Sequence, residues 1–292
     1  MEWTLERGLS IDEFAPRLSF FFNAHNDFFE EIAKFSAARG LWAHLMRDRF
    51  GARDERSLKL RFHAQTAGCS LTWQQPYNNV ARTSLQAMAA VLGGCQSLHT
   101  NSLDEAYALP GEHAVTIALR TQQVLAYESG VTATPDPFGG SYFLERLTAD
   151  SEEAARAYIR QIDGMGGMIP AIEAGFPQRE IAAASYAYQQ AIESGEKVVI
   201  GVNAYRSEEP PIAILQIDRA AADHQIRKLE ALRTRRSAAR VEQTLAALKR
   251  GAEREENTMP MILDAVRAYA TVGEICGALK DVFGSYTEAA LV

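Results

Sequence analysis

The chain has 292 residues, of which 47% are hydrophobic and 23% charged, and its formal net charge is −7 at pH 7. This composition is typical of a soluble globular protein, and the negative charge argues against a nucleic-acid-binding surface. The sequence shows no signal peptide and no apolar run near the roughly 18 residues of a membrane helix, and its three scattered cysteines form no Cys-x-x-Cys pair, so we expect a cytoplasmic protein without a zinc site.

The first 130 residues repeat a strand followed by a helix. Strands are predicted at 17–22, 58–65 and 95–100. The helices that follow are predicted at about 28–49, 76–92 and 112–127, with a short additional helix at 102–109. Three such units, about 40 residues apart, predict a parallel sheet of the doubly wound or barrel kind.

The pattern changes after residue 130. A loop rich in turn-forming residues is predicted at 131–143, and one further strand at 197–203. The remaining predicted elements are all helices, at about 150–164, 168–174, 178–194, 218–255, 258–270 and 273–283. We therefore divide the chain into residues 1–130, with the strands, and residues 131–292, which are mostly helical.

Polar side chains occupy alternate positions of the predicted strands. Arg61, His63 and Gln65 share one face of the second strand, because successive side chains of a strand point to opposite faces. The first strand offers Arg17 and Ser19, and the third offers either Gln96 with Thr100 or Ser97 with His99. Burying such groups without partners costs several kcal/mol each. Either they line a channel that holds a long polar ligand, or they are bonded to backbone at the strand ends.

Several long motifs carry a family resemblance. The segments PRLSFFFNAHNDFFEEIAKF, RFHAQTAGCSLT, QQPYNNVART and GGCQSLHTNSLDEA resemble the catalytic subunit of the adenosylcobalamin-dependent acyl-CoA mutases, the family of methylmalonyl-CoA mutase. The resemblance covers nearly the whole chain. It implies an α/β fold: a partial (β/α)8 TIM-type barrel with only the C-terminal strands, in residues 1–130, followed by a mostly helical extension and linker region, in residues 131–292.

The resemblance also implies which residues bind ligands. In this family the pantetheine arm of coenzyme A threads the barrel, so the coenzyme A contacts are expected at Arg17, Ser19, His63 and Gln96. Cobalamin is expected to face Gln65, Gly68, Glu105 and Ala106. The side-chain types suit these roles, since arginine binds phosphate through several donors, glycine allows close approach, and a carboxylate can accept from ribose hydroxyls. No catalytic residue and no metal ligand are expected in this chain.

The resemblance further implies partners. Neither the Gly-Tyr-His motif of the preceding barrel strands nor the Asp-x-His-x-x-Gly motif of the cobalamin-binding domain occurs in the sequence. We therefore expect a complementary N-terminal barrel chain, a separate cobalamin-binding small subunit that supplies the cobalt ligand, and an oligomeric assembly that binds neither nucleic acid nor membrane. The expected reaction is the radical carbon-skeleton rearrangement of an acyl-CoA such as methylmalonyl-CoA or isobutyryl-CoA, with the chain inactive alone.

Two alternatives remain open at this point. The chain could be a truncated, non-catalytic coenzyme A-binding relic or a regulatory subunit. An unrelated barrel aldolase or lyase would need a Schiff-base lysine or metal ligands at strand ends. The only lysine of the three strands, Lys59, lies at an amino-terminal end. One local departure from the family also bears on assembly: Ser36 and Gly40 stand where arginines are common, which puts an outer helix contact in doubt.

Overall fold

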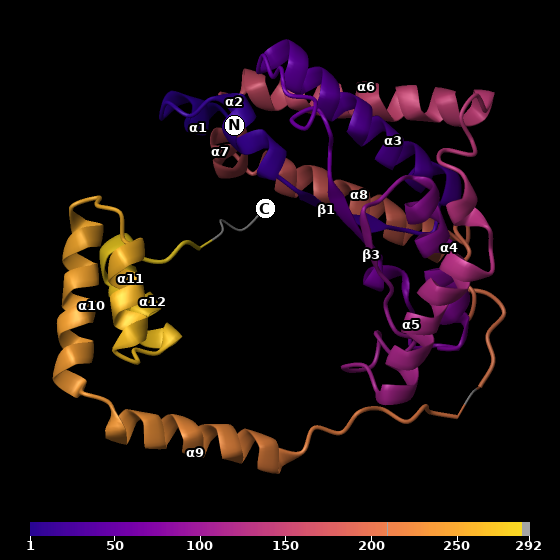
Figure 1. The fold of residues 1–292 in the computed structure, drawn as a ribbon. Coiled ribbons are helices and arrows are strands. Elements are labelled where there is room, and N and C mark those ends of the chain that lie inside the picture. The colour runs from indigo at the N-terminus through magenta and orange to yellow at the C-terminus, as the bar shows by residue number, and fades with distance from the viewer. Residues whose placement is uncertain (209, 288–292) are drawn as a thin grey trace. The chain divides into compact units, whose positions relative to one another are not determined.

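The computed structural model describes residues 1–208 and 210–287, and the chain divides into two compact units, unit 1 (residues 1–215) and unit 2 (residues 216–292) (Figure 1). The predicted division at residue 130 falls inside unit 1 and stays a prediction. Residue 209 and the last five residues of the predicted second region, 288–292, lie outside the described residues. No helix in the described part of the chain is long and apolar enough to cross a membrane.

Unit 1 is built on a parallel sheet of three strands in the order β1-β2-β3. The strands are β1 (Phe20–Ala24), β2 (Phe62–Thr66) and β3 (Ser97–His99). In the register, Phe21 lies opposite His63, and His63 lies opposite Ser97. The prediction of an α/β fold with a parallel sheet is therefore confirmed, although each strand begins two to four residues later than predicted.

The helices of unit 1 follow the strands and then continue alone. Their order is α1 (Glu2–Glu6), α2 (Ile11–Phe14), η1 (Ala15–Arg17), α3 (Phe28–His44), the π-helical turn η2 (Leu45–Arg49), η3 (Gly68–Ser70), α4 (Asn78–Leu92), α5 (Glu112–Tyr127), η4 (Val131–Ala133), α6 (Tyr142–Gly164), α7 (Met168–Glu173) and α8 (Phe176–Ser194). Asp27 caps α3, because its carboxylate accepts from Glu30 N at 3.3 Å.

One face of the sheet is covered by α3 and α4. Phe62 and Ala64 of β2 pack against Phe35 of α3 and Ala90 of α4, and all four are buried. The Phe35 and Phe62 rings stack with centroids 5.1 Å apart. A side chain at Gly93 would meet Phe35, since a Cβ there would lie 2.5 Å from the ring. The glycine thus lets the end of α4 close on the core.

Unit 2 contains only helices among its described residues: α9 (Arg219–Arg235), α10 (Ala238–Glu253), α11 (Met259–Arg267) and α12 (Val272–Phe283). Its core consists of Leu248, Ala265 and Ile275. The prediction of one helix over 218–255 is wrong, because the chain is extended at Arg236 and Ser237 caps a new helix. The guanidinium of Arg236 is bound by the carboxylate of Glu274, and this contact stabilises the extended backbone between α9 and α10.

Two other predicted elements are wrong. Residues 197–203 form no strand, since Ile200 makes only an isolated bridge and Asn203 bonds back to the Lys197 and Ile192 carbonyls. Residues 102–109 form turns instead of a helix. There the buried Asp104 accepts from Ser102 Oγ at 2.5 Å and from Gly111 N at 2.8 Å, and local bonding of this kind competes with a helix.

Candidate functional site

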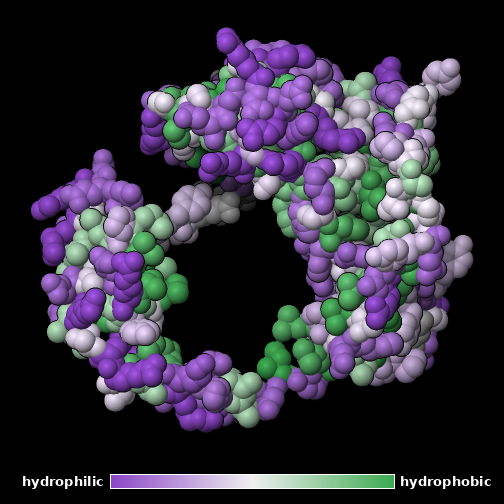
Figure 2. All heavy atoms as spheres, in the orientation of Figure 1, coloured by the Kyte–Doolittle hydropathy of each residue, from purple (hydrophilic) through white to green (hydrophobic). Residues whose placement is uncertain are grey.

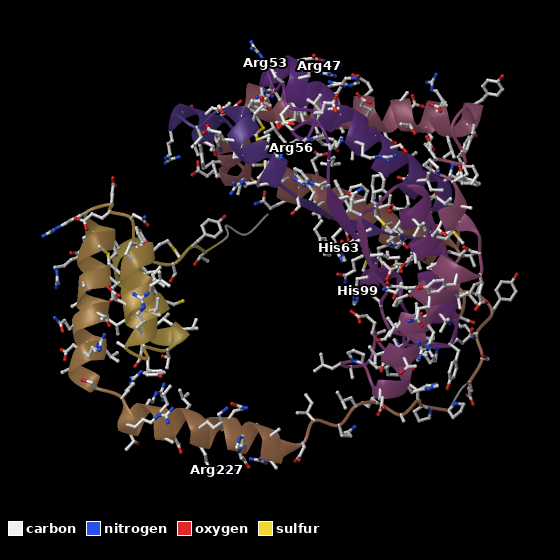
Figure 3. The ribbon with its side chains drawn as sticks, viewed as in Figure 1. Arg47, Arg53, Arg56, His63, His99 and Arg227 are labelled. Carbon is white, nitrogen blue, oxygen red and sulfur yellow. The ribbon has the colours of Figure 1, made fainter. Side chains whose placement is uncertain are left out.

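The uncovered face of the sheet gathers the polar residues of all three strands. His63 and Gln65 lie opposite Ser97 and His99 in the register, so the third strand contributes these two residues to the shared face. Figure 3 shows His63 and His99 projecting from the same side of the sheet. In this chain the face is an open surface, because Ser97 and His99 are exposed and His63 is half-buried. We call it the open face.

Basic residues lie at the amino-terminal end of the open face. Arg17 ends η1, three residues before Phe20 begins β1, and Ser19 directly precedes that strand. Arg61 precedes β2 at the parity of His63. All three side chains are exposed. This end of the face can therefore bind anionic groups such as phosphate.

A histidine and an aromatic ring occupy the middle of the open face. His63 Nδ1 lies 2.7 Å from Ser97 Oγ. The Phe21 ring contacts the His63 ring, with centroids 5.3 Å apart, and Phe21 is 59% exposed. Phe21 was not predicted as a site residue, because the prediction considered only polar side chains. Its position two residues after Ser19 could have indicated that it shares the same face. It offers an apolar contact within a polar surface.

Gln96 lies outside this arrangement. It precedes β3, and its position alternates with that of Ser97. Its side chain is bonded to backbone, since Oε1 accepts from Phe62 N at 2.7 Å and Nε2 donates to Gly94 O at 2.8 Å. Gln96 therefore matches the second possibility considered for the polar strand residues, bonding to backbone at a strand end. Its role toward coenzyme A stays a prediction.

The predicted cofactor residues meet at the carboxyl-terminal end of β2. Gln65 Nε2 donates to Asn101 Oδ1 at 3.3 Å, and Asn101 in turn donates to the Thr66 carbonyl at 2.9 Å. A Cβ at Gly68 would lie 3.0 Å from Asn101 Nδ2 and 3.3 Å from Glu105 Oε1. Glu105 is exposed, as is the adjacent Ala106. Glycine at position 68 therefore lets the loop carrying Glu105 approach β2.

Buried amides support this end of the sheet, and sequence reasoning missed them. Gln86 of α4 accepts from Ala67 N at 3.0 Å and donates to Ser70 Oγ at 2.6 Å. Asn79 donates to the Leu103 carbonyl at 2.9 Å. Both side chains are fully buried. They fix the loops that follow β2 and β3, so the positions of Gly68 and Glu105 depend on α4.

His25 follows β1 at the same end of the sheet. Its ring packs edge-on against Tyr188 of α8 at 6.2 Å, and Lys197 lies 4.7 Å above the Tyr188 ring. Burial lowers the pKa of His25, because desolvation disfavours the charged imidazolium. His25 Nδ1 accepts from Asn26 N at 2.8 Å, which leaves Nε2 as the donor.

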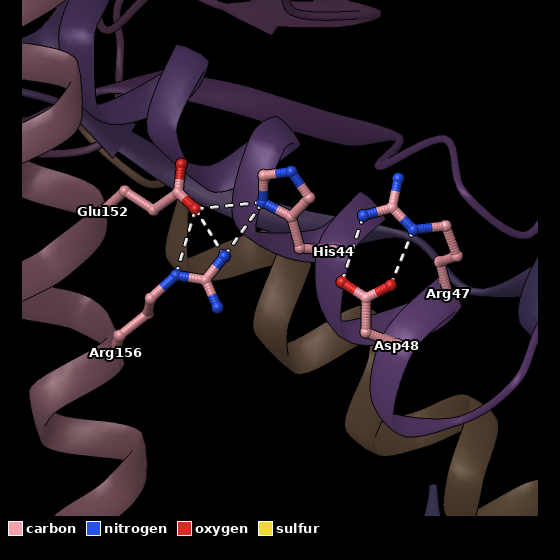
Figure 4. Close-up of polar contacts among 5 residues, drawn as sticks. All are labelled: His44, Arg47, Asp48, Glu152 and Arg156. Atoms are coloured by element: carbon pink, nitrogen blue, oxygen red, sulfur yellow. Dashed lines mark hydrogen bonds and ion pairs between the residues drawn. The ribbon is translucent and has the colours of Figure 1, made fainter.

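A second polar cluster joins α3 to α6, away from the open face (Figure 4). Glu152 binds His44 at 3.1 Å and Arg156 at 2.5 Å. Although burial alone would raise it, the hydrogen bonds from Arg156 and His44 lower the pKa of Glu152. A Cβ at Gly40 would lie 3.1 Å from Glu152 Oε2. Position 40, where this chain has glycine and an arginine is expected from the resemblance, thus lies beside a carboxylate that already bonds to His44 and Arg156.

Nothing in the described part of the chain resembles a metal centre. No group of three or more histidine, cysteine, aspartate or glutamate side chains there is placed to hold a metal ion. The open face itself presents hydrogen-bonding groups, with the basic residues at one end and the amide and carboxylate groups at the other. It can bind an extended polar ligand.

Comparison with known proteins gives consistent matches. The sequence model described as methylmalonyl-CoA mutase matches residues 1–285. The 2-hydroxyisobutanoyl-CoA mutase large subunit of Aquincola tertiaricarbonis is 47% identical over 286 residues, which cover 96% of this chain and 50% of that protein. Methylmalonyl-CoA mutase of Rhizobium meliloti (strain 1021) is 48% identical, covering 97% and 40%. The mitochondrial enzyme of Homo sapiens is 47% identical, covering 97% and 38%. The chain spans half or less of the length of these relatives.

Proposed function

Because the chain belongs to the methylmalonyl-CoA mutase family, we propose that it is the part of a cobalamin-dependent acyl-CoA mutase that holds the coenzyme A arm and meets the cofactor. The reaction is an isomerisation, the radical rearrangement of an acyl-CoA carbon skeleton, as between methylmalonyl-CoA and succinyl-CoA or between isobutyryl-CoA and butyryl-CoA. The observation that carries the proposal is the open face, on which three parallel strands present polar groups in one line.

The open face serves as one wall of a (β/α)8 barrel. A barrel interior is normally filled with branched apolar side chains, whereas this wall carries His63, Gln65 and His99. Such a wall suits a channel that an elongated polar ligand fills. The remaining strands come from the part of the large subunit that this chain does not match, and the assembly is an oligomer in the cytoplasm.

Coenzyme A lies along the wall with its phosphates at the amino-terminal end. Arg17 and Ser19 bind the phosphates, and Arg61 adds a second guanidinium at the same end. His63, held by Ser97 at 2.7 Å, bonds to an amide of the pantetheine arm. Phe21 covers an apolar stretch of the arm or of the acyl group. Gln96 approaches the arm only after its backbone bonds are exchanged.

The residues at the other end of the wall fit a cobalamin. The Glu105 carboxylate and the Gln65 amide provide an acceptor and a donor–acceptor pair for ribose and corrin amide groups. Gly68 keeps the backbone there without a side chain, and Ala106 is small and exposed. When bound, adenosylcobalamin would supply the radical that starts the rearrangement. A partner, the cobalamin-binding small subunit, supplies the cobalt ligand.

This chain acts by positioning. Its residues bind coenzyme A, hold one side of the cofactor and help to exclude water from the reacting centre. No residue on the open face has to act as a general acid or base. The expectation of a subunit partner is supported by the relative that is named a large subunit.

Reconstitution tests the proposal. The chain is combined with the part of the Aquincola large subunit that it does not match, with that enzyme's partner subunit and with adenosylcobalamin. Turnover of isobutyryl-CoA, 2-hydroxyisobutanoyl-CoA and methylmalonyl-CoA is then assayed, and coenzyme A binding is measured by calorimetry. Turnover of one of these thioesters is expected.

The other outcomes are equally informative. Binding of coenzyme A without any turnover or cofactor binding would replace the proposal by the non-catalytic coenzyme A-binding alternative. Absence of both binding and turnover in an assembled complex would refute it.

A further inference from the structure

Residues 197–207 follow α8 and form a compact loop, which we call the tether loop. Asn203 holds this loop closed. Its Nδ2 donates to the carbonyls of Ile192 and Lys197 at 2.8 and 2.7 Å. Its Oδ1 accepts from Val199 N at 2.7 Å. The tether loop is therefore fixed both internally and to the end of α8.

Gln75, in the loop after β2, binds the tether loop through its side-chain amide. Its Nε2 donates to Tyr205 O and to Ser207 Oγ, both at 2.8 Å. Its Oε1 accepts from Asn78 Nδ2 at 2.9 Å. A Cβ at Gly201 would lie 3.1 Å from Gln75 Cδ, so glycine lets the two loops touch. Both polar atoms of the Gln75 amide are thus engaged.

The backbone of Gln75 has a conformation that is rare for its residue type. Its φ is +50°, in the left-handed region that residues other than glycine, asparagine and aspartate seldom adopt. Such a conformation costs free energy and persists only where the surrounding contacts impose it. Here those contacts are the hydrogen bonds to the tether loop, and an outlier held in this way motivates a functional hypothesis.

Arg82 of α4 makes a second connection between the two loops. Its Nη2 donates to Ile200 O at 2.8 Å, and its Nη1 donates to Thr72 Oγ1 at 2.9 Å. Nη1 also donates to Asn79 Oδ1 at 2.7 Å. These three acceptors are neutral, so the half-buried guanidinium joins the segments as a hydrogen-bond donor.

The loop after β3 is bonded in turn to the loop after β2. The Tyr107 hydroxyl donates to the Trp73 carbonyl. Tyr107 directly follows Glu105 and Ala106, which the proposed function assigns to the cofactor. A cavity of about 470 Å³ lies where the loops meet, and its lining includes Trp73, Tyr107 and Ser207. A continuous series of contacts therefore leads from the tether loop to the proposed cofactor residues.

The end of β1 is connected to the same arrangement. Lys34 of α3 donates from Nζ to Asn23 O at 2.7 Å. Just after the strand, the His25 ring packs against Tyr188 of α8, and Lys197, the first residue of the tether loop, lies 4.7 Å above the Tyr188 ring. The tether loop thus reaches the carboxyl-terminal ends of both β1 and β2.

Large apolar side chains are exposed at this end of the sheet. Trp73 is 63% exposed and Leu109 is 61% exposed. Figure 2 shows hydrophobic residues among hydrophilic ones at the surface over α5, the helix that follows the loop after β3. Exposed apolar groups beside polar ones are typical of binding surfaces, and they suit a large ligand that covers both loops.

We propose that Gln75 is a positioning residue for adenosylcobalamin, because it ties the loops after β2 and β3 to the tether loop. It acts through Trp73 and Tyr107 on Glu105 and Ala106. Without this tie the two loops would populate the binding-competent arrangement less, and the apparent dissociation constant of the cofactor would rise by the same factor. The inference rests on the proposed function, because that function places the cofactor at Glu105 and Ala106.

Substitution of Gln75 tests the proposal in the enzyme assembled with the Aquincola fragments, with adenosylcobalamin as the probe. Gln75→Ala removes both bonds to the tether loop, and Gln75→Gly removes them while also relieving the left-handed backbone. Gln74→Ala is the matched control, since the Gln74 side chain makes no hydrogen bond to any described residue. Circular dichroism melting of each variant verifies folding.

Both Gln75 variants are expected to raise the apparent dissociation constant of adenosylcobalamin about fivefold or more, measured by absorbance titration. Turnover at saturating cofactor and the affinity for coenzyme A should stay within about twofold of wild type, because the change alters loop populations and not the bound arrangement. Gln74→Ala should match wild type within about twofold in all three measurements. In the isolated chain, Gln75→Ala should accelerate hydrogen exchange at residues 71–76 and 105–108.

Several results would overturn the proposal. One is an unchanged cofactor affinity in both Gln75 variants, and another is an equal loss in Gln74→Ala. A parallel loss of coenzyme A affinity would show general loosening of the fold instead of positioning. Unchanged exchange at residues 105–108 would exclude the tie between the loops. If even the wild-type assembly binds no adenosylcobalamin, the proposed function fails, whereas exchange in the isolated chain still decides whether Gln75 ties the loops.

Discussion

The two faces of the three-stranded sheet differ in what completes them. On the covered face, Phe62 and Ala64 alternate with the polar positions and pack against α3 and α4, so this chain supplies both sides of the contact. On the open face, His63 and Gln65 sit on the same strand, yet most of their hydrogen-bonding groups have no partner among residues 1–208 and 210–287. One face is a finished core and the other is half of a binding site. Mutations should therefore separate stability from binding.

The largest effect on stability is expected on the covered face. Phe35 is fully buried and stacks on Phe62 at 5.1 Å. Phe35→Ala should lower the free energy of unfolding of unit 1 by about 3–5 kcal/mol, because it leaves a cavity. Urea unfolding followed by tryptophan fluorescence measures unit 1 alone, since all three tryptophans lie in it. A loss below about 1 kcal/mol would mean that the face is not the core.

A smaller loss of stability is expected when the buried amide of Gln86, which supports the loop after β2, is removed. Gln86→Leu removes the partners of Ala67 N and Ser70 Oγ in a buried place and should cost about 2–3 kcal/mol in the same experiment. Thr83→Val is the matched control on α4. Thr83 is 2% exposed and its hydroxyl has no partner among the described residues, so this change should be neutral or stabilising. Equal losses for both variants would contradict the account.

Unit 2, whose described residues form helices and no strand, extends the comparison to the effect of pH on stability. The hydrogen bond from Arg236, aided by Thr271, lowers the pKa of Glu274 to about 2. Its contribution is therefore complete above the unfolded pKa of roughly 4.3 and is lost as the pH falls toward 2. With allowance for solvent screening, we expect about 1–2 kcal/mol. Hydrogen exchange of α10 and α12 amides should accelerate over this range in the wild type, and Glu274→Gln should remove most of the pH dependence.

The smallest effect on stability is expected on the open face. His63→Ala should change the free energy of unfolding by less than about 1 kcal/mol, because it loses one partly exposed hydrogen bond to Ser97. In the assembled enzyme the same change should weaken coenzyme A binding about tenfold or more, measured by calorimetry. His99→Ala tests how far binding extends toward β3. A His63 variant that unfolds readily would remove the distinction between the two faces.

Sequence reasoning predicted the sheet well and its surroundings less well. Alternation identified the three strands and the shared face of His63 and Gln65, because period-two patterns are local. The parity predicted for Arg17 was wrong, because Arg17 lies in the helical turn η1 and not in a strand. The prediction of a strand at 197–203 was wrong. This apolar run has the composition of a strand, but it makes only one isolated bridge instead of pairing with a neighbouring strand. A propensity cannot show whether a partner exists.

The candidate site shows the same limit. The choice between Gln96 with Thr100 and Ser97 with His99 needed the register between β2 and β3, which no single strand encodes. The supporting amides Gln86 and Asn79 lie on a helix whose pattern is only amphipathic, and their partners are backbone groups of distant loops. Only the folded chain brings these groups together.

The bond between Lys34 and the Asn23 carbonyl has a consequence for handling the protein. Two identical chains stacked edge to edge along β1 would each bring an ammonium group to the same row of backbone groups. Each ammonium is also paired with the carboxylate of Glu31, so self-stacking would take a hydrated ion pair out of water, which opposes fibre-like association. We therefore expect chemical acetylation of this lysine to hasten turbidity in concentrated samples.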